Sequence, residues 1–131
     1  MASSQFFILA IVAILVPSIL AKEFVVGDQK GWTINFDYQD WAIGKEFHVG
    51  DKLVFKYPKG VHNVLAVNGS SFQKCVAPAG TQPLTSGNDV ITLATPGIKW
   101  YICSVPNHCQ VGNQRLIIIV EPSPASAPSP N

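Results

Sequence analysis

The first 21 residues of the sequence contain no charged side chain, and the rest of the chain has almost no excess of either sign. Lysine and arginine number nine and aspartate and glutamate eight, for a formal net charge of +1 over 131 residues. Without a basic stripe the chain does not resemble a nucleic-acid binder, and without an acidic excess it does not resemble an acidic disordered protein. Sustained helical periodicity is also absent. Aromatic residues make up 10% of the chain, which favours a packed, strand-rich domain.

An apolar segment without charges opens the chain. It runs from Phe6 to Val16, is followed by Pro17 and small residues, and ends at Ala21. A short apolar stretch that closes on a small residue is typical of a secretory signal peptide, although the usual basic side chain before it is missing. A transmembrane anchor is the alternative, but Pro17 interrupts a run that is barely long enough to span a bilayer. We expect residues 1–21 to be a cleaved signal peptide, no membrane span to remain, and the mature protein to be extracellular, in the apoplast or cell wall, where disulfides persist.

The composition changes again near the other end of the sequence. Residues 122–131 contain four prolines, and we expect them to form an extended, polar Pro/Ser-rich tail. Asn68-Gly69-Ser70 is an N-glycosylation sequon, which secretion would expose to modification at Asn68. The folded domain is therefore expected at residues 22–121, and about 100 residues suffice for one domain with a hydrophobic core.

The region between leader and tail has the pattern of short strands separated by turns. Alternating apolar and polar residues predict a strand at Lys52–Tyr57. Further strands are predicted at Phe24–Val26, Val61–Val67, Val90–Ala94, Ile98–Cys103 and Leu116–Val120. The last of these is continuously apolar, which indicates a central position in a sheet. One helical turn is expected at Tyr38–Ile43, whereas Phe72–Val76 could be helix or strand. Short strands at this spacing predict an all-β antiparallel sandwich or barrel.

Three cysteines, Cys75, Cys103 and Cys109, leave one thiol over in an oxidising compartment. The odd thiol either pairs with another chain or has a function that keeps it reduced. A candidate function lies beside Cys103, because His108 follows it five residues later across a turn. His62 is on a different predicted strand. Two imidazoles and one thiolate, with a weak fourth ligand, form the donor set of a blue copper electron-transfer site.

If Cys103 binds a metal, the other two cysteines, Cys75 and Cys109, remain to pair. His108 and Cys109 are adjacent, so in extended backbone His108 can face the metal while Cys109 faces away. The alternative is a zinc site, built from the same two histidines with Cys103 and Cys109. It would require adjacent residues to converge on one ion, and it would leave Cys75 as an unpaired thiol. A Cys–His nucleophile is a further alternative, but no oxyanion motif accompanies it.

At these positions the chain resembles the phytocyanins, the secreted single-domain blue copper proteins of plants. The resemblance is carried by Val26-Gly27-Asp28, Gly31-Trp32, Phe47-His48-Val49-Gly50-Asp51, Val61-His62-Asn63-Val64, Trp100-Tyr101-Ile102-Cys103 and His108-Cys109. It implies a cupredoxin-like Greek-key β-sandwich of about seven to eight strands with one or two short helical turns, and one type 1 copper ion. It implies His62, Cys103 and His108 as ligands. It also implies a Cys75–Cys109 disulfide and electron transfer through the exposed imidazole edge near His108.

The fourth copper ligand is the point at which the chain departs from the family pattern. That ligand is usually Met or Gln, five residues after the second histidine, where this chain has Asn113. Met1 is the only methionine and would be lost with the leader, which excludes a Met ligand. Gln114 fits the motif of the Gln-ligated members if the loop has one extra residue, so we expect Gln114 as the axial ligand. Asn63 is expected to reach the cysteine sulfur with its backbone N–H. His48 is expected to be a surface or turn residue.

The sequence thus predicts a secreted, monomeric carrier of single electrons, with no catalytic residue and no nucleic-acid partner. Its redox partner is not indicated, since transient electron-transfer contacts are small and leave little trace in sequence. A structural or signalling cell-wall protein that keeps the fold without copper is the alternative, because the axial position is irregular. An oxidase is disfavoured, since reduction of O₂ to water normally needs more copper centres than three histidines can supply.

Overall fold

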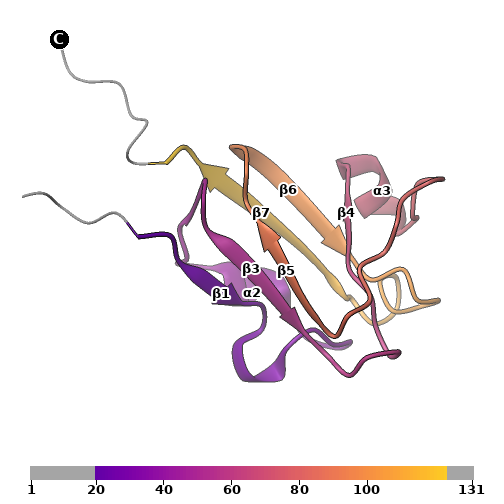
Figure 1. Cartoon of the computed structure of the whole chain (residues 1–131). Coiled ribbons are helices and arrows are strands. Elements are labelled where there is room, and N and C mark those ends of the chain that lie inside the picture. Colours follow the sequence, from indigo (N-terminus) through magenta and orange to yellow (C-terminus); the bar gives the residue numbers. More distant parts are fainter. Residues whose placement is uncertain (1–19, 124–131) are drawn as a thin grey trace, which may run out of the picture.

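The computed structural model describes residues 20–123, which form two β-sheets packed face to face (Figure 1). The smaller sheet has the strand order β1-β3-β5, and the larger one has the order β2-β7-β6-β4. The strands are β1 (Glu23–Val25), β2 (Phe47–His48), β3 (Lys52–Lys56), β4 (Leu65–Val67), β5 (Asn88–Thr92), β6 (Gly97–Ile102) and β7 (Arg115–Glu121). The pairs β1–β3 and β2–β7 are parallel, and the other pairs are antiparallel. Seven strands in two layers within the described range confirm the predicted β-sandwich, but the two parallel pairs show that its sheets are mixed and not purely antiparallel as expected.

Short helical segments connect some of the strands. They are η2 (Asp28–Lys30), α2 (Tyr38–Ala42) and α3 (Gly69–Lys74). α2 forms at the predicted helical turn because the side chain of Asp37 accepts hydrogen bonds from two backbone N–H groups of the first turn. Asn68 caps α3 in the same way, with its side chain accepting from the backbone N–H of Ser71. The Phe72–Val76 segment, for which the sequence allows helix or strand, is therefore helical as far as Lys74.

The two sheets share one hydrophobic core. Leu53 and Phe55 of β3 pack in the same cluster as Leu116 and Ile118 of β7, and all four are at most 3% exposed. The ring centroid of Phe55 is 5.6 Å from that of Tyr101 on β6, which joins the layers directly. Burial of each such side chain contributes about 1.5–3 kcal/mol. The sandwich is thus a rigid base for the loops at its ends.

One of the strand predictions is wrong, and another is confirmed. β4 covers only Leu65–Val67, so His62 lies in the loop before the strand and not on the strand. A turn closed by the hydrogen bond from Val61 N–H to Pro58 O, at 3.1 Å, delays the start of the strand. β7 is central in its sheet, as predicted, but it is not buried on both faces. Ile119 is 62% exposed while the residues on either side are buried, so only one face packs on the core.

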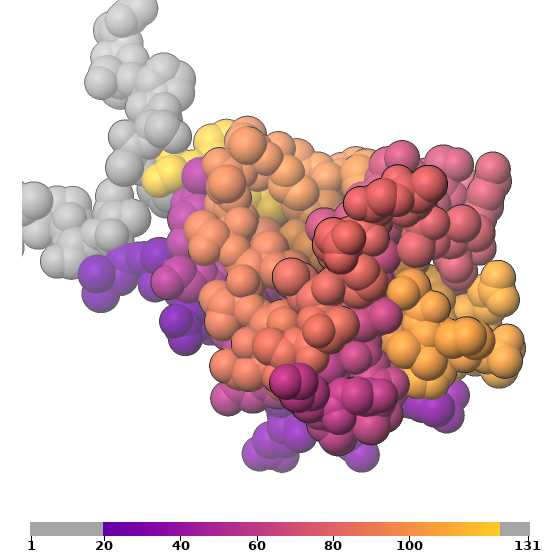
Figure 2. All heavy atoms as spheres, turned by 45° about the vertical axis from the view of Figure 1, so that its right-hand side comes forward, coloured from indigo at the N-terminus to yellow at the C-terminus, as the bar shows by residue number. Residues whose placement is uncertain are grey.

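The loops that carry the predicted site lie at the same end of the sandwich, on the right in Figure 1. In the space-filling view of Figure 2, the light-orange loop between β6 and β7 stands next to the magenta segment around residue 60. Most of the predicted signal peptide (1–21) and of the predicted tail (122–131) lies outside the described residues. Within residues 20–123, no helix has the length and hydrophobicity needed to cross a bilayer.

Candidate metal centre

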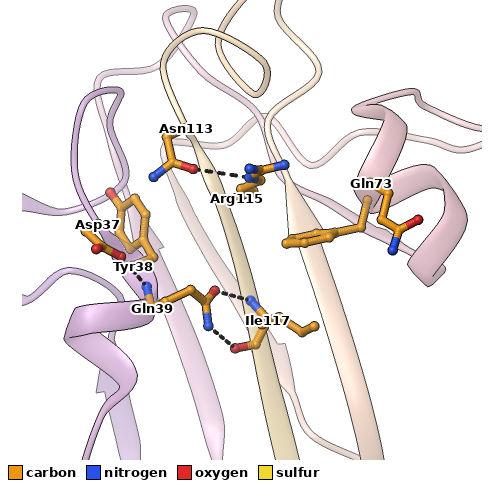
Figure 3. A pocket seen from close by; sticks show the side chains of 8 residues that line it. Asp37, Tyr38, Gln39, Gln73, Asn113, Arg115 and Ile117 are labelled. Atoms are coloured by element: carbon orange, nitrogen blue, oxygen red, sulfur yellow. Dashed lines mark hydrogen bonds between the residues drawn. The ribbon is translucent and has the colours of Figure 1, made fainter.

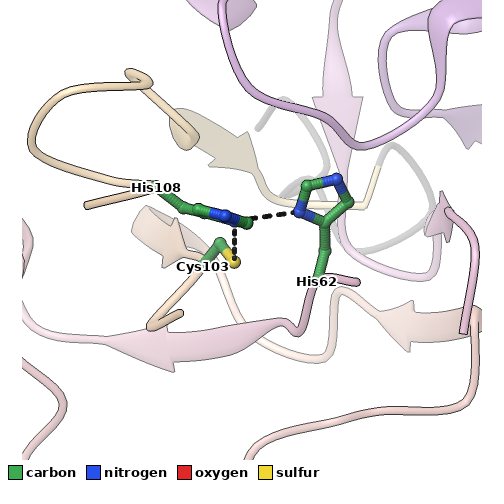
Figure 4. Close-up of side chains that lie close together, drawn as sticks. All are labelled: His62, Cys103 and His108. Carbon is green, nitrogen blue, oxygen red and sulfur yellow. Dashed lines mark hydrogen bonds between the residues drawn. The ribbon is translucent and has the colours of Figure 1, made fainter. Parts of the chain in front are cut away.

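Three of the predicted ligands come together at this end of the sandwich. His62 precedes β4, Cys103 directly follows β6, and His108 lies in the loop between β6 and β7. Their donor atoms all lie within 4.8 Å of one another, and Figure 4 shows the two imidazoles and the thiol turned toward each other. The Nδ1 atoms of the two histidines are 3.0 Å apart, and Nδ1 of His108 is 3.6 Å from Sγ of Cys103.

The spacing of these donor atoms suits a single ion. Two donors bound to one transition-metal ion, at about 2.0–2.3 Å each, lie about 3–4 Å apart, and both measured distances fall in this range. Among residues 20–123 this is the single group of at least three His, Cys, Asp or Glu side chains close enough to bind one metal ion. His48 lies on β2 and is not part of it.

Burial and hydrogen bonding set the protonation of the donors. Cys103 is fully buried and His62 is 7% exposed, whereas His108 is only half-buried. Burial, and then the nearby charge of His108, lowers the pKa of His62, which favours the neutral imidazole that binds metals. Burial raises the pKa of the Cys103 thiol, against the lowering effect of the backbone N–H groups of Asn63 and Val105. A buried thiol with a raised pKa is a poor nucleophile, which argues against Cys–His catalysis.

Asn63 connects the two loops of the cluster. Its side-chain Nδ2 donates to Oγ of Ser104 at 3.0 Å, and its Oδ1 accepts from the backbone N–H of Ser104 at 2.8 Å. Its carbonyl accepts from the indole N–H of Trp32 at 2.8 Å. Its own N–H reaches Cys103, as the family resemblance implies. The contact with Ser104 was not apparent from the sequence, because the two residues are 41 positions apart.

Gln114 is fully buried, and neither atom of its side-chain amide has a hydrogen-bond partner. An unpaired buried polar group costs about 1–3 kcal/mol, so such groups are rare and call for an explanation. The side chain is close enough to His62 to act on the pKa of that imidazole, in the direction opposite to burial. Its backbone binds two of the ligand residues, since its N–H donates to His108 O at 3.0 Å and its carbonyl accepts from Cys103 N–H at 3.1 Å. The amide therefore lies beside the cluster with an unused oxygen.

Asn113, the alternative by residue count, is turned away from the cluster. It is exposed, and its Oδ1 accepts from Nε of Arg115 at 3.1 Å (Figure 3). Its backbone φ of 56° lies in the left-handed region, which asparagine tolerates better than most residues. The side chain of Asn113 is thus at the surface, whereas that of Gln114, the next residue, is buried.

Cys75 and Cys109 form a disulfide bond, as expected. The bond joins the end of α3 to the residue after His108, across a sequence separation of 34. Because Cys109 is used in this bond, the zinc alternative loses one of its two sulfur ligands and is wrong. Cys103 is the remaining free thiol of the three cysteines.

Comparisons with known proteins agree with this fold. The sequence matches the model of the plastocyanin-like domain family over residues 32–113. It is 48% identical over 133 residues to blue copper protein 1b of Medicago truncatula, covering 99% of this chain and 82% of that protein. It is 61% identical over 106 residues to a blue copper protein of Petunia hybrida, covering 81% of this chain but only 40% of the petunia protein's length. The solved structure of cucumber stellacyanin, with Cu²⁺ at pH 7.0, has a TM-score of 0.71 at 34% identity, covering 79% of this chain and 98% of that one.

Proposed function

The chain belongs to the plastocyanin-like domain family, among its phytocyanin members, and on this premise we propose that it binds one copper ion and carries single electrons. His62, Cys103 and His108 are the strong ligands, and Gln114 is the weak fourth ligand. The observation that carries the proposal is the convergence of two imidazoles and a buried thiol beside an unpaired amide. Two histidines, one cysteine and a weak axial oxygen form the ligand set of a type 1 copper site.

The donor set suits a redox-active ion and is held in place by the protein itself. Copper bound there would supply a one-electron couple, because thiolate favours Cu(I) and imidazoles bind both oxidation states. Asn63 holds the loops of His62 and Cys103 together, and the disulfide at Cys109 restrains His108 from the other side. The ligands are therefore positioned by protein contacts that do not depend on the ion, which keeps their rearrangement small when an electron moves.

The half-buried imidazole of His108 is the proposed route for electrons. The other two strong ligands are shielded from solvent, so the edge of His108 is the part of the cluster that a partner can approach. The surface nearby carries exposed apolar side chains, including Val61 at 47% and Val111 at 77% exposure. A small contact of this kind suits a transient encounter with a reductant or oxidant. We propose that the protein acts as a monomer and as a carrier, not as an enzyme.

Secretion is part of the same proposal. Residues 1–21 would be the signal peptide, 22–121 the copper-binding domain and 122–131 the tail. The Cys75–Cys109 disulfide supports an oxidising, extracellular setting. Asn68 is exposed, and it uses Oδ1 to cap α3, which leaves its Nδ2 available for an N-linked glycan.

A copper titration tests this function. The full-length chain is produced through a secreting yeast, Cu(II) is added, and the visible spectrum is recorded beside those of Cys103→Ser and His48→Gln. We expect an intense blue band that saturates at one copper per chain, is absent in Cys103→Ser and persists in His48→Gln. A folded protein with its disulfide formed and no blue band would refute the electron carrier. The copper-independent structural or signalling role in the cell wall would then be favoured.

A further inference from the structure

A hollow lies on the outer face of the larger sheet (Figure 3). Its volume is about 380 Å³, and it crosses the start of β7 between the first turn of α2 and α3. Its walls include Asp37, Tyr38, Phe72, Asn113, Arg115 and Ile117. Arg115 and Ile117 are two residues apart on β7, so they point to the face opposite to the buried Leu116. We call this hollow the β7 groove; none of the proposed copper ligands lines it.

Arg115 is at the centre of the β7 groove. It is the one arginine of the chain, and its Cζ lies 5.4 Å from the ring centroid of Phe72. Its Nε donates to Oδ1 of Asn113 at 3.1 Å. These two contacts fix the guanidinium, while its terminal nitrogens have no partner among residues 20–123. A guanidinium held in this way presents a planar pair of donors, which matches the two oxygens of a carboxylate.

The floor of the groove is apolar. It consists of the half-buried ring of Phe72 and the side chain of Ile117, whereas Tyr38 is 1% exposed and its ring packs into the core against Trp32 and Phe36. The nearby amide of Gln39 is fully used, because it donates to Ile117 O at 3.0 Å and accepts from Ile117 N–H at 2.8 Å. Gln39 thereby satisfies the backbone groups of Ile117, a part of β7 that does not pair with β2. Its amide is therefore not available to bind a ligand beside Arg115.

Asp37 limits the charge that the groove can accept. Its carboxylate lies at the α2 end of the groove, to the left of Arg115 in Figure 3, and its Oδ1 is already bound by two backbone N–H groups of α2 at 3.0 and 3.1 Å. A second negative charge on a ligand would meet this carboxylate and be repelled. The groove therefore suits a ligand with one negative charge and disfavours dianions such as phosphate.

We propose that the β7 groove binds a small organic anion with one negative charge and a flat apolar body, that is, an aromatic carboxylate. Arg115 binds the carboxylate, and the aromatic ring lies against Phe72 and Ile117. Arg115 directly follows Gln114 in the chain, but the Gln114 side chain is buried while Arg115 lines the outer face, so the groove is separate from the proposed copper centre. Binding does not require copper, and the two proposals can fail independently.

The test is an NMR titration of the secreted, ¹⁵N-labelled full-length chain with benzoate, without added copper. We expect saturable shifts of the amide resonances of Gln39, Phe72 and Arg115. Arg115→Gln should weaken the apparent affinity by about tenfold or more. Lys56→Gln removes the same charge from an exposed position on the other sheet and should leave the affinity unchanged. Arg115→Lys keeps the charge but loses the planar fork, so it should bind with intermediate affinity.

Two further small molecules test the charge and the ring of the proposed ligand separately. Benzamide has the same shape as benzoate without the charge, and acetate has the charge without the ring, so both should bind more weakly than benzoate. The site would be overturned by equal affinity of benzamide and benzoate, by equal affinity of acetate and benzoate, or by an Arg115→Gln variant that binds benzoate like the unchanged protein. Dispersed resonances verify that each variant is folded, and Arg115→Lys keeps the test decisive if Arg115→Gln does not fold.

Discussion

Asn63 and Ser104 form a contact of two hydrogen bonds between the loop of His62 and the loop of Cys103. The amide nitrogen of Asn63 donates to the Ser104 hydroxyl at 3.0 Å, and the amide oxygen accepts from the Ser104 backbone at 2.8 Å. Each partner is the residue that follows a proposed copper ligand. The contact therefore sets the separation of His62 and Cys103 without touching the ion.

Removal of this contact is expected to loosen both loops. Asn63→Ala leaves the Ser104 backbone N–H without its acceptor, which should lower the free energy of unfolding by about 1–3 kcal/mol and weaken copper binding. Urea denaturation and a competitive copper titration measure the two effects. Asn88→Ala is the control, because Asn88 is an exposed asparagine on β5. Equal behaviour of the two variants would mean that the contact does not position the ligands.

Replacement of the axial ligand is expected to change the reduction potential. Gln114→Met exchanges an amide oxygen for a thioether, which favours Cu(I), so the potential should rise. Each tenfold change in the relative affinity for the two oxidation states corresponds to about 59 mV, and we expect a shift of at least this size. Asn113→Gly, which suits the positive φ at that position, should leave the potential unchanged. Voltammetry of both variants decides between the residues, since a shift in Asn113→Gly alone would make Asn113 the ligand.

Loss of the disulfide is expected to destabilise the fold. For a sequence separation of 34 the loss of loop closure corresponds to about 3–4 kcal/mol in the Cys75→Ala/Cys109→Ala double variant. The measurement is urea denaturation of the copper-free protein. Cys103→Ala is the control, because it removes a fully buried sulfur that forms no bond. A loss in the control as large as in the double variant would show that packing of the sulfur atoms, and not the crosslink, is responsible.

All three tyrosines of the chain are expected to ionise only at a pH well above that of an exposed tyrosine. Burial raises the pKa of Tyr38, Tyr57 and Tyr101 to about 12, and for Tyr57 the hydrogen bond to Asp89 acts in the same direction. In the unfolded chain a tyrosine titrates near 10. The neutral phenols therefore contribute stability that is fully present below about pH 10 and is lost as the pH rises through about 12. Ultraviolet absorbance of tyrosinate in the native protein should show no ionising phase near pH 10, and such a phase would contradict the burial of at least one ring.

The features that could be predicted from the sequence depend on local patterns. Alternation along Lys52–Tyr57 predicted a strand, and β3 forms there. The spacing from Cys103 to His108 brings two donors to one loop, and the odd number of cysteines singled out the thiol that remains free. The family resemblance, carried here by Val61-His62-Asn63-Val64, favoured His62 over His48 as the further ligand. The position of His62 in a loop could not be predicted, because the turn before it depends on a backbone hydrogen bond.

The features that the sequence left open depend on a single dihedral angle or on distant partners. Residue count favoured Asn113 and motif favoured Gln114, and in the structure Asn113 has left-handed backbone and an exposed side chain while Gln114 is buried. The contact from Asn63 to Ser104 spans 41 positions and has no local signal. The apolar run of β7 predicted its central position in the sheet, but it did not show that Ile119 faces solvent. Each of these outcomes is set by packing of the complete fold.

The most direct test of the proposed centre is a crystal structure of the copper-loaded, secreted protein with anomalous diffraction measured at the copper absorption edge. We predict one anomalous peak, bound by Nδ1 of His62, Nδ1 of His108 and Sγ of Cys103 at about 2.0–2.3 Å, the usual metal–nitrogen and metal–sulfur distances. The amide oxygen of Gln114 should be the next nearest protein atom. A copper peak away from these three donors, or no peak in protein that has been exposed to copper, would contradict the assignment of this cluster as the copper site.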